Sequence, residues 1–447
     1  MNIVIAGDGE VGFHLAKSLS ELEHNITVVD PHSELLQKLE REMDILAIAG
    51  DSTSFQVLQH ANVQSCDLLL AVVHDESINI ITCILAKKMG AKRTVARISN
   101  VEYLQPQNKT MFRDLGVDEM VCPERIAAKE IINLLNYNIA TEFFDFSNGL
   151  LSMYLIRLDE NASVIGKTMR EIVMEYPGIE VRIVAILRNG KTIIPNSVVR
   201  FQKGDLAYVI SKPGQLEPIK KVIGSSDVNI KSVMIAGGGR IGRFAALNLE
   251  DKLSVTLVDE NRTRCEGLTE VLEKTLIING DATDTELLRE EGIEKTDAFV
   301  AVTNSTETNI LTCLHARNYG VKKTIALVEN TDFINLSQAI GIDTIINKKL
   351  ITASYIARFT VKGDAVSSKW LSGTNAELIE LTAQEKSRAT RLPIKDLNIP
   401  QGATIGGIIR GNQALLPTRD MQIMAGDKVV VFTLPKVMYA ISKLFEK

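Results

Sequence analysis

Several features of membrane-spanning, secreted and nucleic-acid-binding proteins are missing from this sequence of 447 residues. No apolar run approaches the roughly 20 residues that a membrane-spanning helix needs, and the sequence begins without the basic segment and cleavage pattern of a signal peptide. The 50 basic and 55 acidic residues leave a net charge of −5, without the basic excess of a polyanion binder. We therefore expect a cytoplasmic protein that binds no nucleic acid and reaches a membrane only through a partner.

Cysteine and histidine are scarce. Five cysteines, an odd number, and the absence of a C-x-x-C pair argue against a disulfide framework or a zinc site, so we expect inert thiols. The six histidines form no H-E-x-x-H pattern, and none lies between Asp75 and Leu314. The sequence also lacks a P-loop and a nucleophile elbow. These absences predict no metal site and no catalytic residues, and they favour binding and sensing over catalysis.

The most informative feature that is present is an internal repeat. The segment G-D-G-E-V-G at 7–12 recurs as G-G-G-R-I-G at 237–242. Further pairs keep nearly the same spacing: Asp30 and Asp259, Gly50–Thr53 and Gly280–Thr283, Asn79 and Asn309, and Cys83 and Cys313. A weaker pairing at a slightly shorter spacing relates Arg188 and Gly204-Asp205 to Arg410 and Gly426-Asp427. We therefore expect four domains, at 1–140, 141–226, 231–365 and 366–447.

Each large copy begins with the pattern of a dinucleotide-binding unit. A short apolar strand, Ile3–Ile5 or Val233–Ile235, precedes the glycine turn, a helical pattern follows, and a second strand ends at an aspartate. This order, with the acidic residue about 20 positions after the turn, is the dinucleotide-binding fingerprint. The predicted fold class is α/β, with two Rossmann-like doubly wound parallel-sheet domains, each followed by a small β-rich α+β lobe.

The fingerprint predicts a role for each residue of the turn. Gly7 allows the tight turn, Gly9 lets the backbone approach a pyrophosphate, and Gly12 lets the helix pack on the strand. Asp30 is expected to accept hydrogen bonds from the ribose hydroxyls and to repel a 2′-phosphate, which favours NAD or an adenine nucleotide over NADP. In the second copy these roles fall to Gly237, Gly239, Gly242 and Asp259.

Other candidate contacts follow later strands, because the carboxyl ends of parallel strands line the ligand crevice. Asp51 and Asp281 are candidates for ligand contact, with a loop or N-cap role as the alternative. Arg97 ends a strand where it could pair with a phosphate or form a salt bridge instead. Its counterpart is Leu327, whereas Arg240, Arg262 and Arg264 lie on the rim of the second site, so the two sites can differ in ligand or affinity. Candidate neighbours of the adenosine are Val73, His74, Thr303 and Asn304.

These motifs resemble those of the family of Trk-type potassium-uptake regulators with RCK domains (regulators of potassium conductance, also called KTN). The resemblance covers nearly the whole chain and also includes A-R-I at 96–98, P-E-R-I-A-A-K-E-I at 123–131, G-D-A-T-D at 280–284 and A-V-T-N at 301–304. It implies a non-enzymatic regulatory subunit, a cytoplasmic gating ring on the inner face of the membrane beneath a TrkH-type potassium channel. It also implies NAD(H) and ATP or ADP as ligands and a homo-oligomer, expected to be a tetramer.

The same resemblance assigns residues to two nucleotide sites. It maps Gly7, Asp8, Gly9, Glu10, Val11, Asp30, Val73, His74 and Arg97 onto the first site. It maps Gly237, Gly238, Gly239, Arg240, Ile241, Asp259, Thr303 and Asn304 onto the second. One departure is Ile346-Asn347-Lys348-Lys349, where the family often has a Ser-Pro segment, so the helix after it can pack or dock differently.

Alternatives remain open from the residues alone. An NAD-dependent oxidoreductase with duplicated Rossmann domains would need a His, Lys or Glu beside the nicotinamide, and no spacing compels one. A structural adaptor without nucleotide is disfavoured by the intact glycines, and a DNA-binding regulator by the lack of a basic stripe. The apolar stripes at Glu124–Leu135 and Leu350–Phe359 predict helices that either pair the Rossmann domains or are ordinary core helices.

Overall fold

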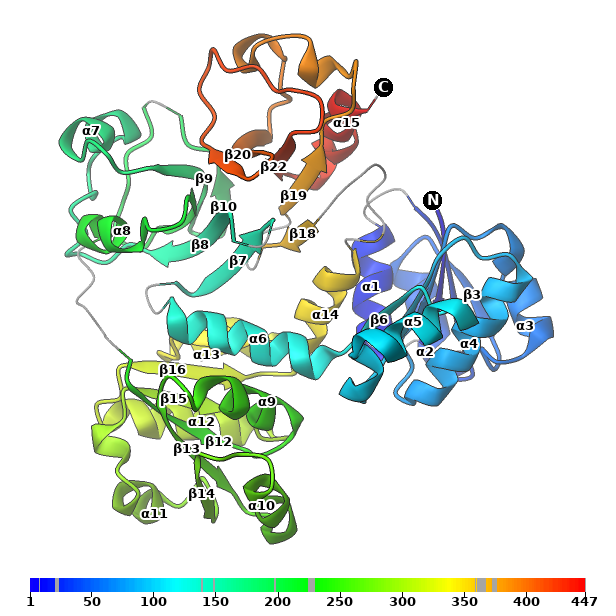
Figure 1. The fold of residues 1–447 in the computed structure, drawn as a ribbon, viewed down its shortest axis with the longest axis horizontal. Coiled ribbons are helices and arrows are strands. Elements are labelled where there is room, and N and C mark those ends of the chain that lie inside the picture. Colours follow the sequence, from blue (N-terminus) through cyan, green and yellow to red (C-terminus); the bar gives the residue numbers. More distant parts are fainter. Residues whose placement is uncertain are drawn as a thin grey trace. The chain divides into compact units, whose positions relative to one another are not determined.

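The computed structural model describes residues 1–7, 9–20, 24–137, 140–147, 149–196, 198–223, 230–357, 359, 367–371 and 376–446. The chain forms two compact units. Unit 1 comprises residues 1–127 and the segment from Asn347 that contains helix α14 (Lys348–Ala357). Unit 2 comprises Ala128–Ile346 and the C-terminal part of the chain. Figure 1 shows both units, with many of their helices and strands labelled.

Unit 1 is built on a six-stranded parallel sheet with the order β3-β2-β1-β4-β5-β6. Its strands are β1 (Asn2–Ala6), β2 (Asn25–Asp30), β3 (Leu46–Ala49), β4 (Leu68–Ala71), β5 (Thr94–Arg97) and β6 (Glu119–Val121). The helices after them are α1 (Glu10–Ser20), α2 (Ser33–Glu42), α3 (Phe55–His60), α4 (Glu76–Met89), α5 (Pro106–Leu115) and the first residues of α6 (Pro123–Asn136), which continues into unit 2 from Ala128. Every residue of β4 is buried, as expected for a central parallel strand covered on both faces.

Unit 2 contains a second parallel sheet with the matching order β14-β13-β12-β15-β16-β17. Its strands are β12 (Ser232–Ala236), β13 (Ser254–Asp259), β14 (Leu276–Asn279), β15 (Ala298–Ala301), β16 (Lys323–Leu327) and β17 (Thr344–Ile346). Its helices are α9 (Arg240–Leu249), α10 (Arg262–Thr269), α11 (Thr285–Glu290), α12 (Thr306–Asn318) and α13 (Asp332–Ala339). In both sheets the strand order reverses beside the first strand, the position at which doubly wound sheets typically bind their ligands.

Two antiparallel five-stranded lobes complete unit 2, with the orders β10-β9-β11-β8-β7 and β18-β19-β22-β20-β21. The first lobe holds β7 (Glu142–Phe146), β8 (Leu151–Arg157), α7 (Met169–Glu175), β9 (Val181–Arg188), β10 (Lys191–Ile193), β11 (Leu206–Ser211) and α8 (Leu216–Ile223). The second holds β18 (Ser367–Trp370), β19 (Glu377–Thr382), β20 (Ala403–Arg410), β21 (Gln413–Leu415), β22 (Lys428–Thr433) and α15 (Pro435–Phe445). Parallel sheets with helices plus antiparallel lobes confirm the predicted fold class.

The weaker sequence repeat corresponds to one ion pair in each lobe. Arg188 Nε lies 2.7 Å from Asp205 Oδ1, and Arg410 Nη2 lies 2.8 Å from Asp427 Oδ2. Both carboxylates are buried. The pairing raises the pKa of each arginine, mainly through the hydrogen bond to the carboxylate. The repeated Arg and Gly-Asp positions therefore correspond to the same Arg–Asp ion pair in both lobes.

The two lobes share a hydrophobic core in which glycine permits close approach. A Cβ atom on Gly406 would lie 2.3 Å from Ile210 Cδ1, and one on Gly407 would lie 2.3 Å from Leu151 Cδ1. These distances are far below van der Waals contact, so a side chain at either position would push the two sheets apart. The lobes therefore form one packed body within unit 2.

Some predicted element bounds were wrong. The apolar run Leu68–Val73 has the length of a strand, but β4 ends at Ala71, and the Val73 N–H donates to the Asn79 side chain instead of a neighbouring strand. The helix expected over Leu350–Phe359 is α14, Lys348–Ala357. This helix belongs to unit 1, where it packs against α1. The helix that follows the second parallel sheet in sequence is thus not a core helix of that sheet.

All five cysteines are buried and free of disulfides. Burial raises the pKa of the thiols of Cys66 and Cys122, to about 12 and about 11. Because the thiolate is the reactive form, these values support the expectation of inert thiols. Within the described ranges, no group of three or more His, Cys, Asp or Glu side chains is placed to hold a metal ion. In the same part of the chain, no helix combines the length and apolarity needed to cross a bilayer.

Lys323, the first residue of β16, provides a pH-dependent term in stability. Its side chain is buried, and its Nζ donates to the Ala140 carbonyl at 3.0 Å. Burial lowers the pKa of Lys323 from 10.5 to about 8. Between these two values the unfolded chain binds more protons than the folded chain, so the free energy of unfolding is expected to rise with pH. The rise is about 3 kcal/mol over the window.

The measurement is denaturant unfolding of the wild type and Lys323→Met at pH 8, 9 and 10. The difference between the two proteins isolates Lys323 from the buried thiols and phenols that titrate in the same range. We expect the stability of the wild type relative to the variant to increase with pH. Parallel pH profiles would show that Lys323 does not change its protonation on folding.

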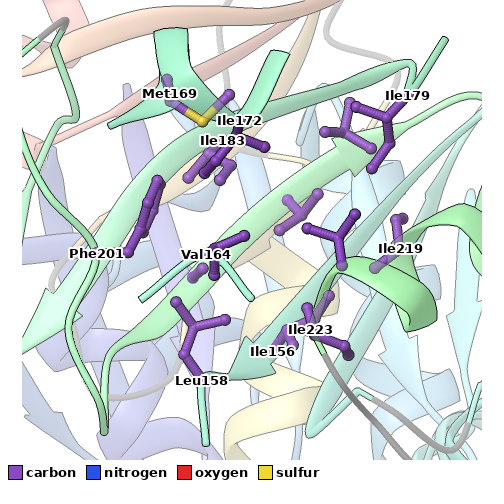
Figure 2. A pocket seen from close by; sticks show the side chains of 14 residues that line it. Ile156, Leu158, Val164, Met169, Ile172, Ile179, Ile183, Phe201, Ile219 and Ile223 are labelled. Carbon is purple, nitrogen blue, oxygen red and sulfur yellow. The ribbon is translucent and has the colours of Figure 1, made fainter. Parts of the chain in front are cut away.

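The core of the first lobe contains an apolar cavity of about 40 Å³. Figure 2 shows side chains that line it, including Met169 and Ile172 of α7 and Ile219 and Ile223 of α8. In the second lobe the position that matches Ile223, at the spacing of the weaker repeat, holds the buried Phe445. A larger side chain is therefore accommodated at this position in the sister lobe.

Ile223→Phe is expected to fill the cavity and stabilise the protein. At about 24 cal/mol per Å³ of void, the gain is about 1 kcal/mol. Thermal unfolding of the full chain measures it, with Ile223→Val as the control that should lower the melting temperature. A lower melting temperature for the Phe variant would mean that the lobe cannot widen to admit the ring.

Candidate functional site

The first glycine turn joins β1 to α1 in a conformation that requires glycine. Gly7 has φ +113°, and its N–H donates to the Val29 carbonyl of β2 at 2.9 Å. A Cβ on Gly12 would lie 1.8 Å from the Gly7 carbonyl oxygen, so only glycine lets α1 approach the turn. A Cβ on Gly9 would meet no atom within 4 Å, which leaves open space above the turn. Asp8 lies outside the described residues.

The second turn, between β12 and α9, repeats this geometry. Gly237 has φ +107°, and its N–H donates to the Val258 carbonyl at 2.8 Å. A Cβ on Gly242 would lie 1.9 Å from the Gly237 carbonyl oxygen, and one on Gly239 would meet no atom within 4 Å. A Cβ on Gly238 would lie 2.7 Å from Leu268 Cδ1. The two turns therefore have the same steric requirements at their first, third and last glycines, and each starts a helix whose first N–H groups lack intrahelical partners.

The two aspartates at the ends of β2 and β13 are buried, and the side chains described beside them differ. Asp30 Oδ1 accepts from the backbone N–H of His32 at 2.9 Å and lies 2.7 Å from His32 Nδ1. Asp259 accepts from the backbone N–H groups of Gly238 at 2.6 Å and Asn261 at 2.9 Å. It also forms an ion pair with Arg264, whose Nη1 lies 2.8 Å from Oδ2. The acidic residue of the fingerprint thus faces a histidine in one site and an arginine in the other.

A buried asparagine in each unit holds the strand ends beside the turn. Asn79 Oδ1 accepts from the Val73 N–H, and Asn79 Nδ2 donates to the carbonyls of Val73 and Arg97, each at 2.9 Å. Asn309 makes the same three contacts with Thr303 and Leu327, at 2.9 to 3.1 Å. Sequence reasoning identified this pair only as part of the repeat. Its recurrence at the spacing of the glycine turns was the signal that the residue has a structural role in both sites.

The candidate loop residues occupy the expected strand ends. Val73 lies beside the first turn, because its backbone N is 3.0 Å from the position of a Cβ on Gly7. The Thr303 backbone N has the same place beside Gly237, at 2.9 Å. The Thr303 hydroxyl donates to Asn309 Oδ1 at 2.7 Å. His74 and Asn304 are exposed next to these residues.

Asp51 and Asp281 lie in loop turns rather than at helix N-caps. Asp51 Oδ1 accepts from the N–H and hydroxyl of Thr53, each at 2.8 Å, and these bonds lower the pKa of Asp51. Asp281 Oδ1 accepts from the Thr283 N–H at 2.8 Å. The N-caps of the helices that follow are Ser54 and Asp284. The preceding residue, Gly50 or Gly280, donates its N–H to the Asp30 or Asp259 carbonyl, so the two loops lie beside the ends of β2 and β13.

Two observations test whether a nucleotide fits the first site. Arg97 Nε is buried without a hydrogen-bond partner among the described residues, and a phosphate oxygen would supply one. The open space at Gly9 admits the backbone approach that a pyrophosphate requires. Together with the helix N-terminus, these groups fit an anionic nucleotide.

Comparisons with known proteins agree with this architecture. The TrkA-N domain family matches residues 3–123 and 233–348, and the TrkA-C domain family matches residues 153–224 and 378–446. The chain is 32% identical over 455 residues to "Trk system potassium uptake protein TrkA homolog 1" of Methanosarcina mazei, covering 100% of both chains. It is 32% identical over 452 residues to "Trk system potassium uptake protein TrkA" of Haemophilus influenzae, covering 100% of this chain and 99% of that one.

Solved structures show the same fold. The GsuK RCK domain matches with a TM-score of 0.61 at 18% identity, covering 99% of this chain and 94% of that chain. The GsuK channel bound to NAD matches with a TM-score of 0.61 at 19% identity, covering 99% of this chain and 78% of that one. GsuK bound to ADP matches with a TM-score of 0.50 at 16% identity, covering 80% and 68%.

Two Rossmann-type sheets with glycine turns at the switch point, each followed in sequence by an antiparallel lobe, define a chain with two repeats of a TrkA-N and a TrkA-C domain. Because both TrkA domains match twice and the two full-length relatives are each 32% identical, the chain belongs to the TrkA family of Trk system potassium uptake proteins. The family resemblance drawn from the sequence motifs is confirmed.

Proposed function

We propose that this protein is a non-catalytic, nucleotide-sensing subunit that forms the gating ring of a Trk-type potassium uptake channel. Its relatives carry the name of the Trk potassium uptake system, and structural neighbours are a channel bound to NAD and a protein bound to ADP. The single observation that carries the proposal is the duplicated glycine turn. An added Cβ would clash with the backbone of the turn at Gly12 and Gly242, whereas one at Gly9 and Gly239 would meet open space. NAD(H), ATP and ADP are the proposed ligands.

The proposed first site contains Gly7, Gly9 and Gly12 of the turn, Asp30 for the ribose, and Arg97 for a phosphate. The proposed second site contains Gly237, Gly239, Gly242 and Asp259. Flanking contacts are assigned to Asp8, Glu10, Val11, Asp51, Val73, His74, Gly238, Arg240, Ile241, Asp281, Thr303 and Asn304. The domains proposed to carry these sites are residues 1–140 and 231–365, and those proposed to form the lobes are 141–226 and 366–447.

A homo-oligomer, proposed to be a tetramer, is supported by exposed apolar side chains at matching places in both units. Ile81 of α4 is 47% exposed, and its counterpart Leu311 of α12 is 55% exposed. Met111 and Leu115 of α5 are also exposed, as are Leu336 of α13 and Ile340, the residue after that helix. Large apolar side chains on neighbouring helices are typical of surfaces that bind another protein. The ring is proposed to lie in the cytoplasm, beneath the inner face of the membrane, on a TrkH-type channel.

Ligand control in such a ring follows from differential affinity. If two ring conformations hold the phosphates at the glycine turn to different extents, each ligand shifts their populations by its own affinity ratio. ATP places more negative charge at the turn than ADP or NAD. The ligand with the larger ratio is expected to set the open fraction of the channel.

The test has two parts. Calorimetric titration of the full chain with ATP, ADP and NADH measures binding, and absorbance shows whether NADH is consumed. Potassium flux through vesicles with a TrkH-type channel, with and without this chain, measures control by each nucleotide. Binding without consumption, together with nucleotide-dependent flux, is expected. Steady NADH oxidation would indicate an oxidoreductase, and no binding by any nucleotide would leave a structural adaptor.

A further inference from the structure

The second glycine-turn site differs from the first at the carboxylate that reads the ribose. Asp259 accepts hydrogen bonds from the backbone N–H groups of Gly238 and Asn261, one on each carboxylate oxygen. Arg264 Nη1 then lies 2.8 Å from Oδ2 and 3.1 Å from Oδ1. A carboxylate has about four lone-pair positions for hydrogen bonds, and these contacts occupy them. A ribose with two free hydroxyls must therefore displace Arg264 to obtain the hydrogen bonds of a typical NAD site.

Arg264 is placed so that it can turn to a ligand. It is the third residue of α10, whose N-cap Asn261 accepts from the Arg264 N–H at 2.9 Å. Its side chain is 41% exposed, whereas that of Asp259 is 3% exposed. Arg262, two residues earlier in the same turn of helix, has a side chain that is 83% exposed. Two guanidinium groups at a helix N-terminus form a favourable environment for a phosphate.

The second site also carries more basic residues around its proposed ribose position than the first site does. Position by position, Arg262, Thr263 and Arg264 replace Ser33, Glu34 and Leu35 of the first site. At the glycine turn, Arg240 replaces Glu10. Acidic neighbours exist in the second site too: Glu260 follows Asp259, and Glu266 lies 3.1 Å from Arg262 Nε. Glu266 engages Arg262, while Arg264 neutralises Asp259, so the repulsion expected of that carboxylate is offset.

From these contacts we propose that Arg264 makes the second site selective for an adenosine ribose that carries a 2′-phosphate, the NADP(H) class. The first site, with Leu35 in the matching position, takes the unphosphorylated ribose of NAD(H) and the adenine nucleotides. A 2′-phosphate removes the hydroxyl that needs Asp259 and gives Arg264 a dianionic partner. This inference rests on the proposed function, since it concerns the selectivity of a site proposed there.

The experiment isolates each site in the full chain. Gly12→Ala closes the first turn and leaves the second for titration, and Gly242→Ala does the reverse. Each protein is titrated with NADH and NADPH, and the ratio of the two dissociation constants is the readout. At the second site NADPH is expected to bind more tightly than NADH. At the first site NADH is expected to bind about tenfold tighter or more, the equivalent of one charge-assisted hydrogen bond.

Reciprocal variants test Arg264 itself. In the Gly12→Ala background, Arg264→Leu is expected to shift the preference about tenfold towards NADH, and Arg264→Lys to retain the wild-type preference in part. In the Gly242→Ala background, Leu35→Arg is expected to shift the first site towards NADPH. Melting temperatures check that each variant is folded. Leu35 is half exposed, so its replacement leaves the core intact.

The outcomes separate the two proposals. Equal preference for NADH at both sites, unaffected by Arg264→Leu, would overturn the role of Arg264 and leave nucleotide sensing standing. Absence of both ligands from both sites of the wild-type chain would overturn the proposed function and this inference with it. Preference for NADPH at the second site that survives Arg264→Leu would assign the selectivity to another residue and refute the proposal.

Discussion

Gly12→Ala is expected to abolish nucleotide binding at the first turn, weakening it about 100-fold or more. The added Cβ would lie 1.8 Å from the Gly7 carbonyl oxygen and 2.8 Å from the Gly7 carbonyl carbon. These are backbone atoms of the turn, so α1 or the turn must shift. The backbone N–H groups at the helix N-terminus then no longer point towards the phosphates. Losing two charge-assisted hydrogen bonds accounts for a factor of this size.

The matched variant is Gly242→Ala, where the Cβ would lie 1.9 Å from the Gly237 carbonyl oxygen. It should remove the second site and leave the first unaffected. Gly267→Ala serves as the control, because its added methyl meets no atom within 4 Å and lies inside helix α10. Calorimetric titration with ADP and NADH gives the stoichiometry and affinity. Wild-type affinity in Gly12→Ala would show that the nucleotide does not bind at this turn.

Asn79→Leu is expected to produce the largest loss of stability among single substitutions near the first site. Asn79 is fully buried and makes three hydrogen bonds that tie Val73, after β4, to Arg97, at the end of β5. Leucine has a similar volume but leaves two carbonyl groups and one N–H group buried without partners. Each such group costs about 1–3 kcal/mol, so a loss of about 3–5 kcal/mol is expected.

Denaturant unfolding of the full chain measures this loss, and Lys88→Gln, at an exposed position of the same helix, is the control. Asn309→Leu should have a similar effect in unit 2, because Asn309 repeats the three contacts. Asn79→Leu should also weaken ligand binding at the first site, since Arg97 and Val73 lose their common support. A change below about 1 kcal/mol would mean that water replaces the amide at these groups.

The sequence was sufficient to predict the two parallel sheets and both glycine turns. The reason is that these features depend on local chemistry: a positive φ at Gly7 and Gly237, apolar strands beside them, and an acidic residue where the second strand ends. Local patterns also placed Val73 and Thr303 beside the turns, because parallel strands end at one edge of a sheet. The nearly constant spacing between the two copies made the second predictable from the first.

Other features were decided by contacts between distant residues. The pattern at Leu350–Phe359 predicted a helix but not that α14 would join unit 1 and pack against α1. An apolar stripe specifies that a helix face is buried and does not specify its partner. The role of Asn79 depends on Arg97, on the next strand along the chain, and appears only when the two strand ends lie together.

The amino-acid sequence by itself therefore determined the repeat, the fold of each copy and the positions of the turns, since each follows from local periodicity and backbone sterics. Only the tertiary structure decided which groups surround the carboxylates of Asp30 and Asp259. Asp30 and Asp259 are equivalent in the sequence pattern, yet Asp259 is paired with Arg264 and Asp30 with His32. The physical reason is that the partner of each aspartate depends on where the side chains at the start of the following helix point. Residue spacing alone does not specify that direction.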